Sequence, residues 1–376
     1  MDIGKGFKIG GLDIRLPIVQ GGMGVGISLA KLASAVANEG GIGVISSVGI
    51  GMLDEYGGKG GSIANIEGLR AEIRKARELS AGVIGVNIMA ALSDFGKMLK
   101  TALQEQADII FVGAGLMLKI PEEIDLSFLE KAKSKIAPIV SSDRAAKIIF
   151  SYWDKHYSHV PDAVVVEGPL AGGHLGFKRN ALDNPAVTLE NILSGVRKVI
   201  SDFEVKYKKK IPIIAGGGIH DGGDIARLLA NGADAVQMGT RFVATEECDA
   251  SAAFKQSYID SKKEDIVIIN SPVGLPGRAI NCDYLKEVAQ GHRKPINCRW
   301  KCLHGCDYHT APYCIARALT NAQQGHLEEG FAFCGANAHK ITGLVKVKEL
   351  IAGLKQEFEA TLEKILTSEN SSQRII

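Results

Sequence analysis

The chain has 376 residues, a net charge of +2 and 46% hydrophobic residues, enough apolar material for a large buried core. Its 44 basic residues nearly balance its 42 acidic ones, which excludes a nucleic-acid binder that works through a broad basic face. The N-terminus lacks the apolar core of a secretory signal, and no run of about 18 apolar residues predicts a membrane span. We therefore expect a folded cytoplasmic protein with neither nucleic acid nor membrane as a partner.

Eight short apolar runs recur along the first two thirds of the chain. They are nearly continuous rather than alternating, which is typical of parallel strands buried on both faces. The predicted strands are Leu16–Gln20, Ile42–Ser46, Val83–Ile88, Asp108–Val112, Ala137–Ser141, Asp162–Val166, Ile211–Ala215 and Asp234–Met238.

Helical patterns separate these runs. Ser28 is a candidate cap for the first helix, and Asp221 or Asp224 stands near the start of another. Further helices are predicted at Ile63–Ser80, Asp143–Tyr152, Leu189–Ile200 and Asp221–Ala230. Eight strand–helix alternations favour an α/β fold of the (β/α)8 TIM-barrel type, with an open parallel sheet as the alternative.

The remainder of the chain is too long to be one closing helix. We divide the sequence into a barrel at residues 1–250, an appended α-rich segment at 251–345, and a C-terminal helix and tail at 346–376. The helix is predicted at Lys346–Leu366, followed by a frayed tail. All seven cysteines follow Thr240, and in a cytoplasmic protein we expect thiols, ligands or redox groups rather than disulfides.

Glycines gather just after the predicted strands, on the rim where barrel enzymes carry their active sites. Gly216–Gly218 follow the seventh strand and Gly239–Thr240 the eighth. Loops after these two strands commonly bind phosphate in barrels, because their backbone N–H groups and a helix start can close on an anion. We therefore expect a phosphate-bearing ligand.

His174 lies in a glycine-rich loop on the same rim, where a histidine can move a proton near neutral pH. The plainer interpretation is a structural loop histidine. Asn87 and Gln237 are polar residues on otherwise apolar strands, suited to a ligand's polar edge, and Met23 could pack on a flat ring. His220 follows the triple glycine and is a weaker candidate beside the phosphate.

Five motifs in order carry a family resemblance: Pro17–Met23, Gly85–Asn87, Ala171–His174, Ala215–Ile219 and Gln237–Phe242. As a set they resemble the nitronate monooxygenase family, formerly called 2-nitropropane dioxygenases, which includes FMN-dependent enoyl-ACP reductases. The resemblance covers about residues 10–250. It implies an FMN-binding barrel with His174 as the active-site histidine.

The resemblance also implies FMN contacts at particular positions. Gly21, Gly22 and Met23 would lie against the flavin, and Asn87 would bond its ring or ribityl edge. Glu167 and Gly172 match further contacts, although the family often has Gln where this chain has Glu167. The phosphate end would be held by Gly217, Gly218, Gln237, Met238, Gly239 and Thr240.

The favoured function is oxidative denitrification of an alkyl nitronate, with O2, to a carbonyl compound and nitrite. In that reaction the flavin takes one electron from the nitronate and needs no NAD(P)H. The alternatives are an enoyl-ACP reductase that uses NAD(P)H, an electron-transfer flavoprotein, and a non-catalytic FMN-holding module. The partner would be a nitronate or an enoyl thioester, and the sequence leaves a homodimer open.

The appended segment carries the pattern Cys298-x3-Cys302-x3-Cys306-x7-Cys314, flanked by Cys282 and Cys334. If residues 298–306 were helical, three thiols would share one face. Four thiolates could hold an iron–sulfur cluster or zinc, but the spacing is not that of a ferredoxin and the usual Cys-x2-Cys pairs are absent. Plain thiols remain the third interpretation.

Overall fold

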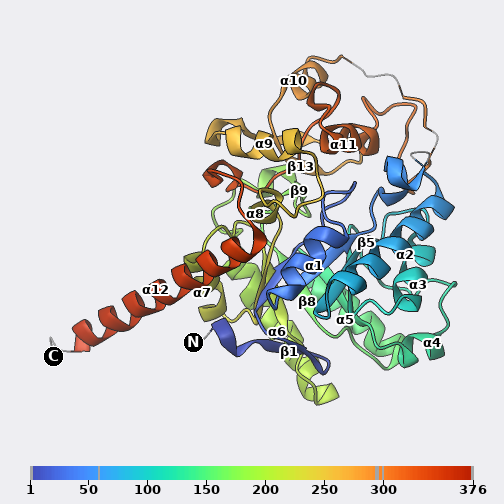
Figure 1. Cartoon of the computed structure of the whole chain (residues 1–376). Helices are drawn as coiled ribbons and strands as arrows, with labels where there is room; N and C mark the ends of the chain where they lie inside the picture. Colours follow the sequence, from blue (N-terminus) through green and yellow to red (C-terminus); the bar gives the residue numbers. More distant parts are fainter. Residues whose placement is uncertain (1–2, 58–59, 293–295, 299, 374–376) are drawn as a thin grey trace.

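The computed structural model describes residues 3–57, 60–292, 296–298 and 300–373. Eight parallel strands close into a barrel in the order β10-β11-β3-β4-β5-β6-β7-β8. Figure 1 shows two of them, β5 and β8, enclosed by helices. Their bounds are β3 Ile18–Gln20, β4 Ile42–Ser46, β5 Val83–Met89, β6 Ile109–Gly113, β7 Lys135–Val140, β8 Val164–Glu167, β10 Ile213–Gly216 and β11 Ala235–Met238. The predicted TIM barrel is confirmed, and closure through β8 and β10 excludes the open sheet.

Helices surround the barrel. They are α1 Ala30–Asn38, α2 Ser62–Leu79, α3 Phe95–Gln104, α4 Leu126–Lys131, α5 Asp143–Tyr157, α6 Leu189–Tyr207, α7 Gly222–Ala230 and α8 Thr240–Val243. Side chains begin several of them: Thr188 accepts a hydrogen bond from the Asn191 N–H (3.2 Å), and Asp221 from the Asp224 N–H (2.9 Å).

The predicted Ser28 cap is wrong. The Ser28 hydroxyl instead accepts from the Met23 N–H at 2.9 Å, which shapes the loop after β3. Helix α1 begins at Ala30, and two carboxylates distant in sequence satisfy its first N–H groups. Asp249 accepts from Leu29 and Leu32, and Glu72 accepts from Ala30 at 2.6 Å. Long-range capping of this kind has no local sequence signature.

An N-terminal hairpin plugs the bottom of the barrel. Strands β1 (Phe7–Ile9) and β2 (Leu12–Ile14) pair antiparallel across a Gly-Gly turn. Ile9 and Ile14 are buried against inward-facing strand residues such as Val19 and Phe111. The interior is therefore a packed core that ends below the mouth.

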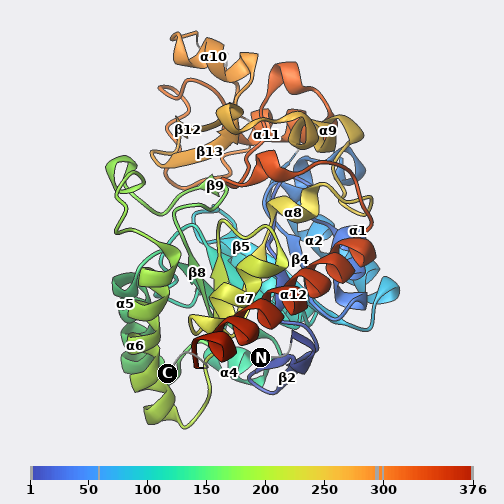
Figure 2. The same ribbon diagram turned by 90° about the vertical axis from the view of Figure 1, so that its left-hand side faces the viewer.

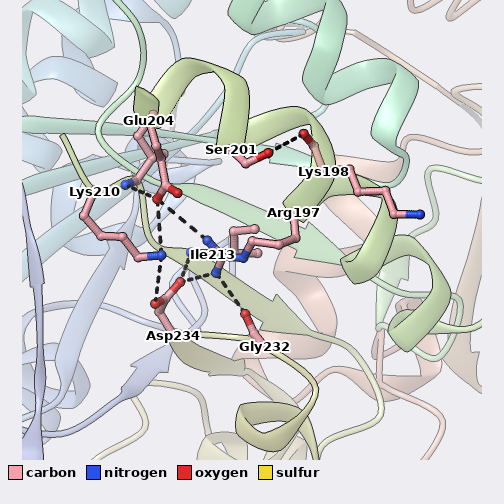
Figure 3. A network of polar contacts seen from close by, with 9 residues as sticks. Arg197, Lys198, Ser201, Glu204, Lys210, Ile213, Gly232 and Asp234 are labelled. Carbon is pink, nitrogen blue, oxygen red and sulfur yellow. Dashed lines mark hydrogen bonds and ion pairs between the residues drawn. The ribbon is translucent and has the colours of Figure 1, made fainter. Parts of the chain in front are cut away.

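Aspartates stand at the bottom rim, just before three of the strands. Each accepts an N–H from the first or second residue of a neighbouring strand and pairs with a cation: Asp108 with Arg77, Asp162 with Lys209, and Asp234 with Arg197. Figure 3 shows the last of these, in which Asp234 accepts from the Ile213 N–H at 2.8 Å and lies 2.5 Å from Arg197 of α6. These contacts join the strand starts to α2, to α6 and to the loop that follows α6, at the end of the barrel opposite the cavity described below.

The last helix of the chain, α12 (Val347–Gln373), completes the outer ring. It packs against α7 and α1, beside the barrel (Figure 2). Gly222 makes the close approach possible, because a Cβ there would fall 2.3 Å from the Leu354 carbonyl oxygen. The helix begins one residue after its predicted start and continues through the predicted tail to Gln373; residues 374–376 lie outside the described part.

The segment between the barrel and α12 covers the mouth of the barrel (Figures 1 and 2). Its helices are α9 Ala252–Asp260, α10 Asp283–Ala289 and α11 Ile315–Gln324. It also holds a hairpin that the sequence analysis does not predict, β12 (Ile266–Asn270) and β13 (Pro276–Ile280). Among the described residues, no helix is long and apolar enough to cross a membrane.

Candidate active site

A cavity of about 370 Å³ opens at the carboxyl ends of the barrel strands. The rim loops form its floor and sides, and the appended segment supplies its roof. It is lined by His174 and by all twelve residues expected to hold a cofactor: Gly21, Gly22, Met23, Asn87, Glu167, Gly172, Gly217, Gly218, Gln237, Met238, Gly239 and Thr240. The structure thus brings the thirteen residues together, and their roles toward a ligand stay predictions.

His174 is fixed by contacts with the appended segment. It lies on the two-residue strand β9 (Gly173–His174), which pairs with β13 so that His174 stands opposite Gly277. Its Nε2 atom is 2.7 Å from the Ser271 hydroxyl, and its ring meets Phe333 edge-on with centroids 5.0 Å apart. Burial lowers the pKa of His174 to about 4, so the imidazole is neutral at physiological pH.

Polar groups without protein partners face the same cavity. Glu167, Gly216 and Gln237 lie in register on the adjacent strands β8, β10 and β11. Within the described part of the chain, neither the Glu167 carboxyl nor the Gln237 amide forms a side-chain hydrogen bond. Burial raises the pKa of Glu167 to about 7. Buried polar groups normally have partners, so these two favour a ligand with polar atoms at the base of the cavity.

Close backbone approach explains one of the rim glycines. A Cβ on Gly22 would fall 2.3 Å from the Cβ of Asn87. Asn87 itself is held from two sides, by the Ser46 hydroxyl at 3.3 Å and the Phe111 carbonyl at 3.5 Å. The loop after β3 can therefore lie flat against the end of β5 only with glycine at position 22.

The loops expected to hold the phosphate end of the ligand lie beside a positive charge, that of Arg241. Gly217 and Gly218 have φ values of +102° and +81°, a conformation that favours glycine. Arg241 and His220 also line this end, and the Arg241 Nε atom donates to the His220 carbonyl at 3.3 Å. Burial, followed by the charge of Arg241, lowers the pKa of His220 to about 4. The backbone of Gly217 and Gly218 and the guanidinium of Arg241 could both contact a phosphate here.

Residues 330–337 contribute to the site without having been predicted. Asn337 donates to the Gly218 carbonyl at 2.6 Å, and the Gly335 N–H donates to the Thr240 hydroxyl at 2.8 Å. Phe333 and Ser271, which contact His174, are also absent from the sequence-based set. Asn337 lies 119 residues from Gly218, and Ser271 lies 97 residues from His174, so only the tertiary fold reveals these contacts.

The four cysteines of the appended pattern line a second cavity, which shares part of its wall with the first. The described residues of 298–306 are not helical, so the expected helical face of thiols does not form. Among the residues described, no group of three or more His, Cys, Asp or Glu side chains converges as ligands of a single ion would.

The closed barrel with a cavity at its rim defines a protein of the TIM-barrel class, and comparison with known proteins identifies its family. The sequence profile of the nitronate monooxygenase family matches residues 5–113 and 94–357. The chain belongs to the nitronate monooxygenase family. This family contains FMN-dependent oxidoreductases.

Individual relatives carry different names. A probable nitronate monooxygenase of Staphylococcus aureus (strain Newman) is 28% identical over 312 residues, covering 74% of this chain and 79% of the relative. A (3aS,4S,5R,7aS)-5-hydroxy-7a-methyl-1-oxo-octahydro-1H-indene-4-carboxyl-CoA dehydrogenase of Mycobacterium tuberculosis is 28% identical over 282 residues, covering 75% and 68%.

Solved structures agree with the fold. FabK from Thermotoga maritima superposes with a TM-score of 0.72 at 28% identity, covering 94% of this chain and 95% of that one. Nitroalkane oxidase from Streptomyces ansochromogenes gives a TM-score of 0.68 at 22% identity, with coverage of 94% and 98%. The second likeness supports the barrel alone.

Proposed function

We propose that the protein is an FMN-dependent nitronate monooxygenase with His174 as its proton-handling residue. The observation that carries the proposal is the buried, neutral imidazole of His174, held by Ser271 at the mouth of the cavity. A neutral imidazole can accept a proton from the carbon beside a nitro group, or bond a nitronate oxygen. A reaction that needs His174 in its protonated form fits the site less well, because the imidazole is neutral.

The cavity fits FMN on several counts. Asn87, Glu167 and Gln237 offer polar contacts for the edge of a flavin ring, and Gly21–Met23 offer a flat wall. Gly217–Gly218 and Gly239–Thr240 would receive the phosphate, with Arg241 nearby. When bound, FMN would supply the one-electron chemistry with substrate and O2.

The protein's own groups do the remaining work. Ser271 orients the His174 ring, and pairing of β9 with β13 fixes its backbone. Phe333, Tyr258 and Leu319 line the roof side with apolar surface, which suits a small alkyl chain and excludes bulk water. Positioning of the substrate against the flavin is therefore assigned to the appended segment.

The test is oxygen uptake and nitrite release by FMN-loaded protein given a small alkyl nitronate, without NAD(P)H. Turnover is expected, and His174→Ala should lower kcat/KM at least about 100-fold while FMN stays bound. The matched control is His326→Ala, at an exposed histidine outside the cavity, which should leave turnover unchanged. Turnover that survives in His174→Ala would contradict the assigned role.

A second candidate is reduction of an enoyl thioester with NAD(P)H. It is favoured by the likeness to FabK across nearly the whole chain and by the CoA-thioester substrate in the name of the mycobacterial relative. Oxidation of NAD(P)H that depends on an enoyl thioester, with no nitronate-driven oxygen uptake, would replace the first proposal with this one.

A further inference from the structure

Four thiols meet in a cavity separate from the candidate flavin site. Cys298, Cys302, Cys306 and Cys314 all line this space of about 290 Å³. None of them forms a disulfide. The other three cysteines of the chain do not line it, which separates a group of four from the rest.

The fold brings the four thiols to the same space from different parts of the segment. Cys298, Cys302 and Cys306 precede α11 in an irregular loop, whereas Cys314 stands at the start of that helix.

The arrangement is too open for one tetrahedral ion. Zinc–sulfur bonds of about 2.3 Å require sulfur atoms roughly 3.8 Å apart around a single point. In the part of the chain that the structure describes, no three such side chains are placed to hold a single ion. Four cysteines that line one cavity without converging on a point suit a cluster better, because its thiolates bind different iron atoms.

The surroundings suit a group of negative charge. Cys314 is the N-cap residue of the ten-residue helix α11, and no side chain caps that helix. Ile315 and Ala316, in its first turn, line the cavity, and so does Lys301. Helix N–H groups and a lysine stabilise thiolates and their clusters.

The loop that carries these cysteines is anchored to the barrel. The Ser93 N–H donates to the Cys302 carbonyl at 3.0 Å, and the Ser93 hydroxyl donates to the Lys301 carbonyl at 2.6 Å. A backbone bridge joins Leu303 to Leu92. The loop therefore has a fixed position even though its described residues contain no helix or strand.

We propose that Cys298, Cys302, Cys306 and Cys314 ligate an iron–sulfur cluster in this cavity. The cavity shares Cys302, Leu303, Ile315 and Ala316 with the candidate flavin site, so the cluster would form part of the roof over the substrate. The proposal stands on the cysteine geometry and does not depend on which substrate the flavin site oxidises or reduces.

The full chain, purified without oxygen, provides the test. We expect iron and acid-labile sulfide in equal amounts, about two or about four of each per chain, with thiolate-to-iron absorption in the visible region and a paramagnetic signal on reduction. If the protein loses the cluster during purification, incubation with ferrous iron and sulfide alone should restore it. Zinc without iron, or no metal after reconstitution, would overturn the proposal.

Two matched variants separate ligation from folding. Cys314→Ser should retain α11, because serine is a favoured N-cap residue, yet should hold iron at least about tenfold more weakly against a chelator. Cys282→Ser makes the same change at the N-cap of α10, away from the cavity, and should keep its iron. Equal iron retention in the two variants would contradict the assigned ligands.

Discussion

A single carboxyl illustrates how the cavity sets the chemistry of one residue. Glu167 ends β8 and faces the cavity without a protein partner among the described residues, and burial raises its pKa to about 7. The folded state therefore keeps the Glu167 proton at pH values where an unfolded chain, with a pKa near 4.5, has released it. This residue costs stability as pH rises from about 4.5 to about 7.

Glu167→Gln should remove that cost. In protein freed of FMN, we expect the variant to gain thermal stability relative to wild type at pH 8, by about 2 °C or more, and to gain less at pH 5. Thermal unfolding followed by circular dichroism at the two pH values provides the measurement. An equal effect at both would mean that the carboxyl is not held protonated by burial.

At the same scale, all thirteen site residues expected from the sequence line the cavity, although most of the lining residues were not among them. Gly22 and His174 could be found because rim positions after strands follow directly from the strand pattern. The Ser271 and Phe333 contacts could not, since they depend on how the segment after the barrel folds back. The neutral state of His174 was also beyond the sequence, because it results from tertiary burial.

At the scale of elements, strands were easier to predict than the contacts that hold their ends. Each barrel strand is a continuous apolar run, so its location shows in the sequence. The hairpin β1–β2 has a recognisable sequence pattern, because apolar and polar residues alternate on both sides of Gly10-Gly11. The sequence analysis considered only the continuous apolar runs of the barrel and did not predict this hairpin. Strand β13 of the hairpin β12–β13 pairs with the two residues of β9, and no local sequence pattern predicts that pairing.

The aspartates at the bottom rim should stabilise the elements that they join. Asp234→Asn keeps an acceptor for the Ile213 N–H but loses the charge that pairs with Arg197. We expect a loss of about 1 kcal/mol in the free energy of unfolding. Asp183→Asn, at an exposed ion pair 3.9 Å from Arg179, is the control and should change little in a thermal unfolding experiment.

The molecule as a whole depends on the last helix to close the ring of helices. Phe358 of α12 is fully buried, together with Leu354 and Ile351 of the same face. Phe358→Ala should cost about 3–5 kcal/mol, whereas Glu359→Ala, at the exposed neighbouring position, should cost little. Comparison of the two unfolding midpoints tests whether α12 is an integral part of the barrel.

The position of α12 also has a consequence in time. In the folded protein, α12 lies beside α7 and the N-terminal α1. During synthesis, however, its first residue, Val347, follows the end of the last barrel strand, Met238, by 109 residues. At about 5–20 residues per second, a ribosome needs roughly 5–20 s to cross that interval. For that period the nascent barrel has all its strands but an uncovered apolar flank, and the roof over its mouth is made before the ring beneath it is complete.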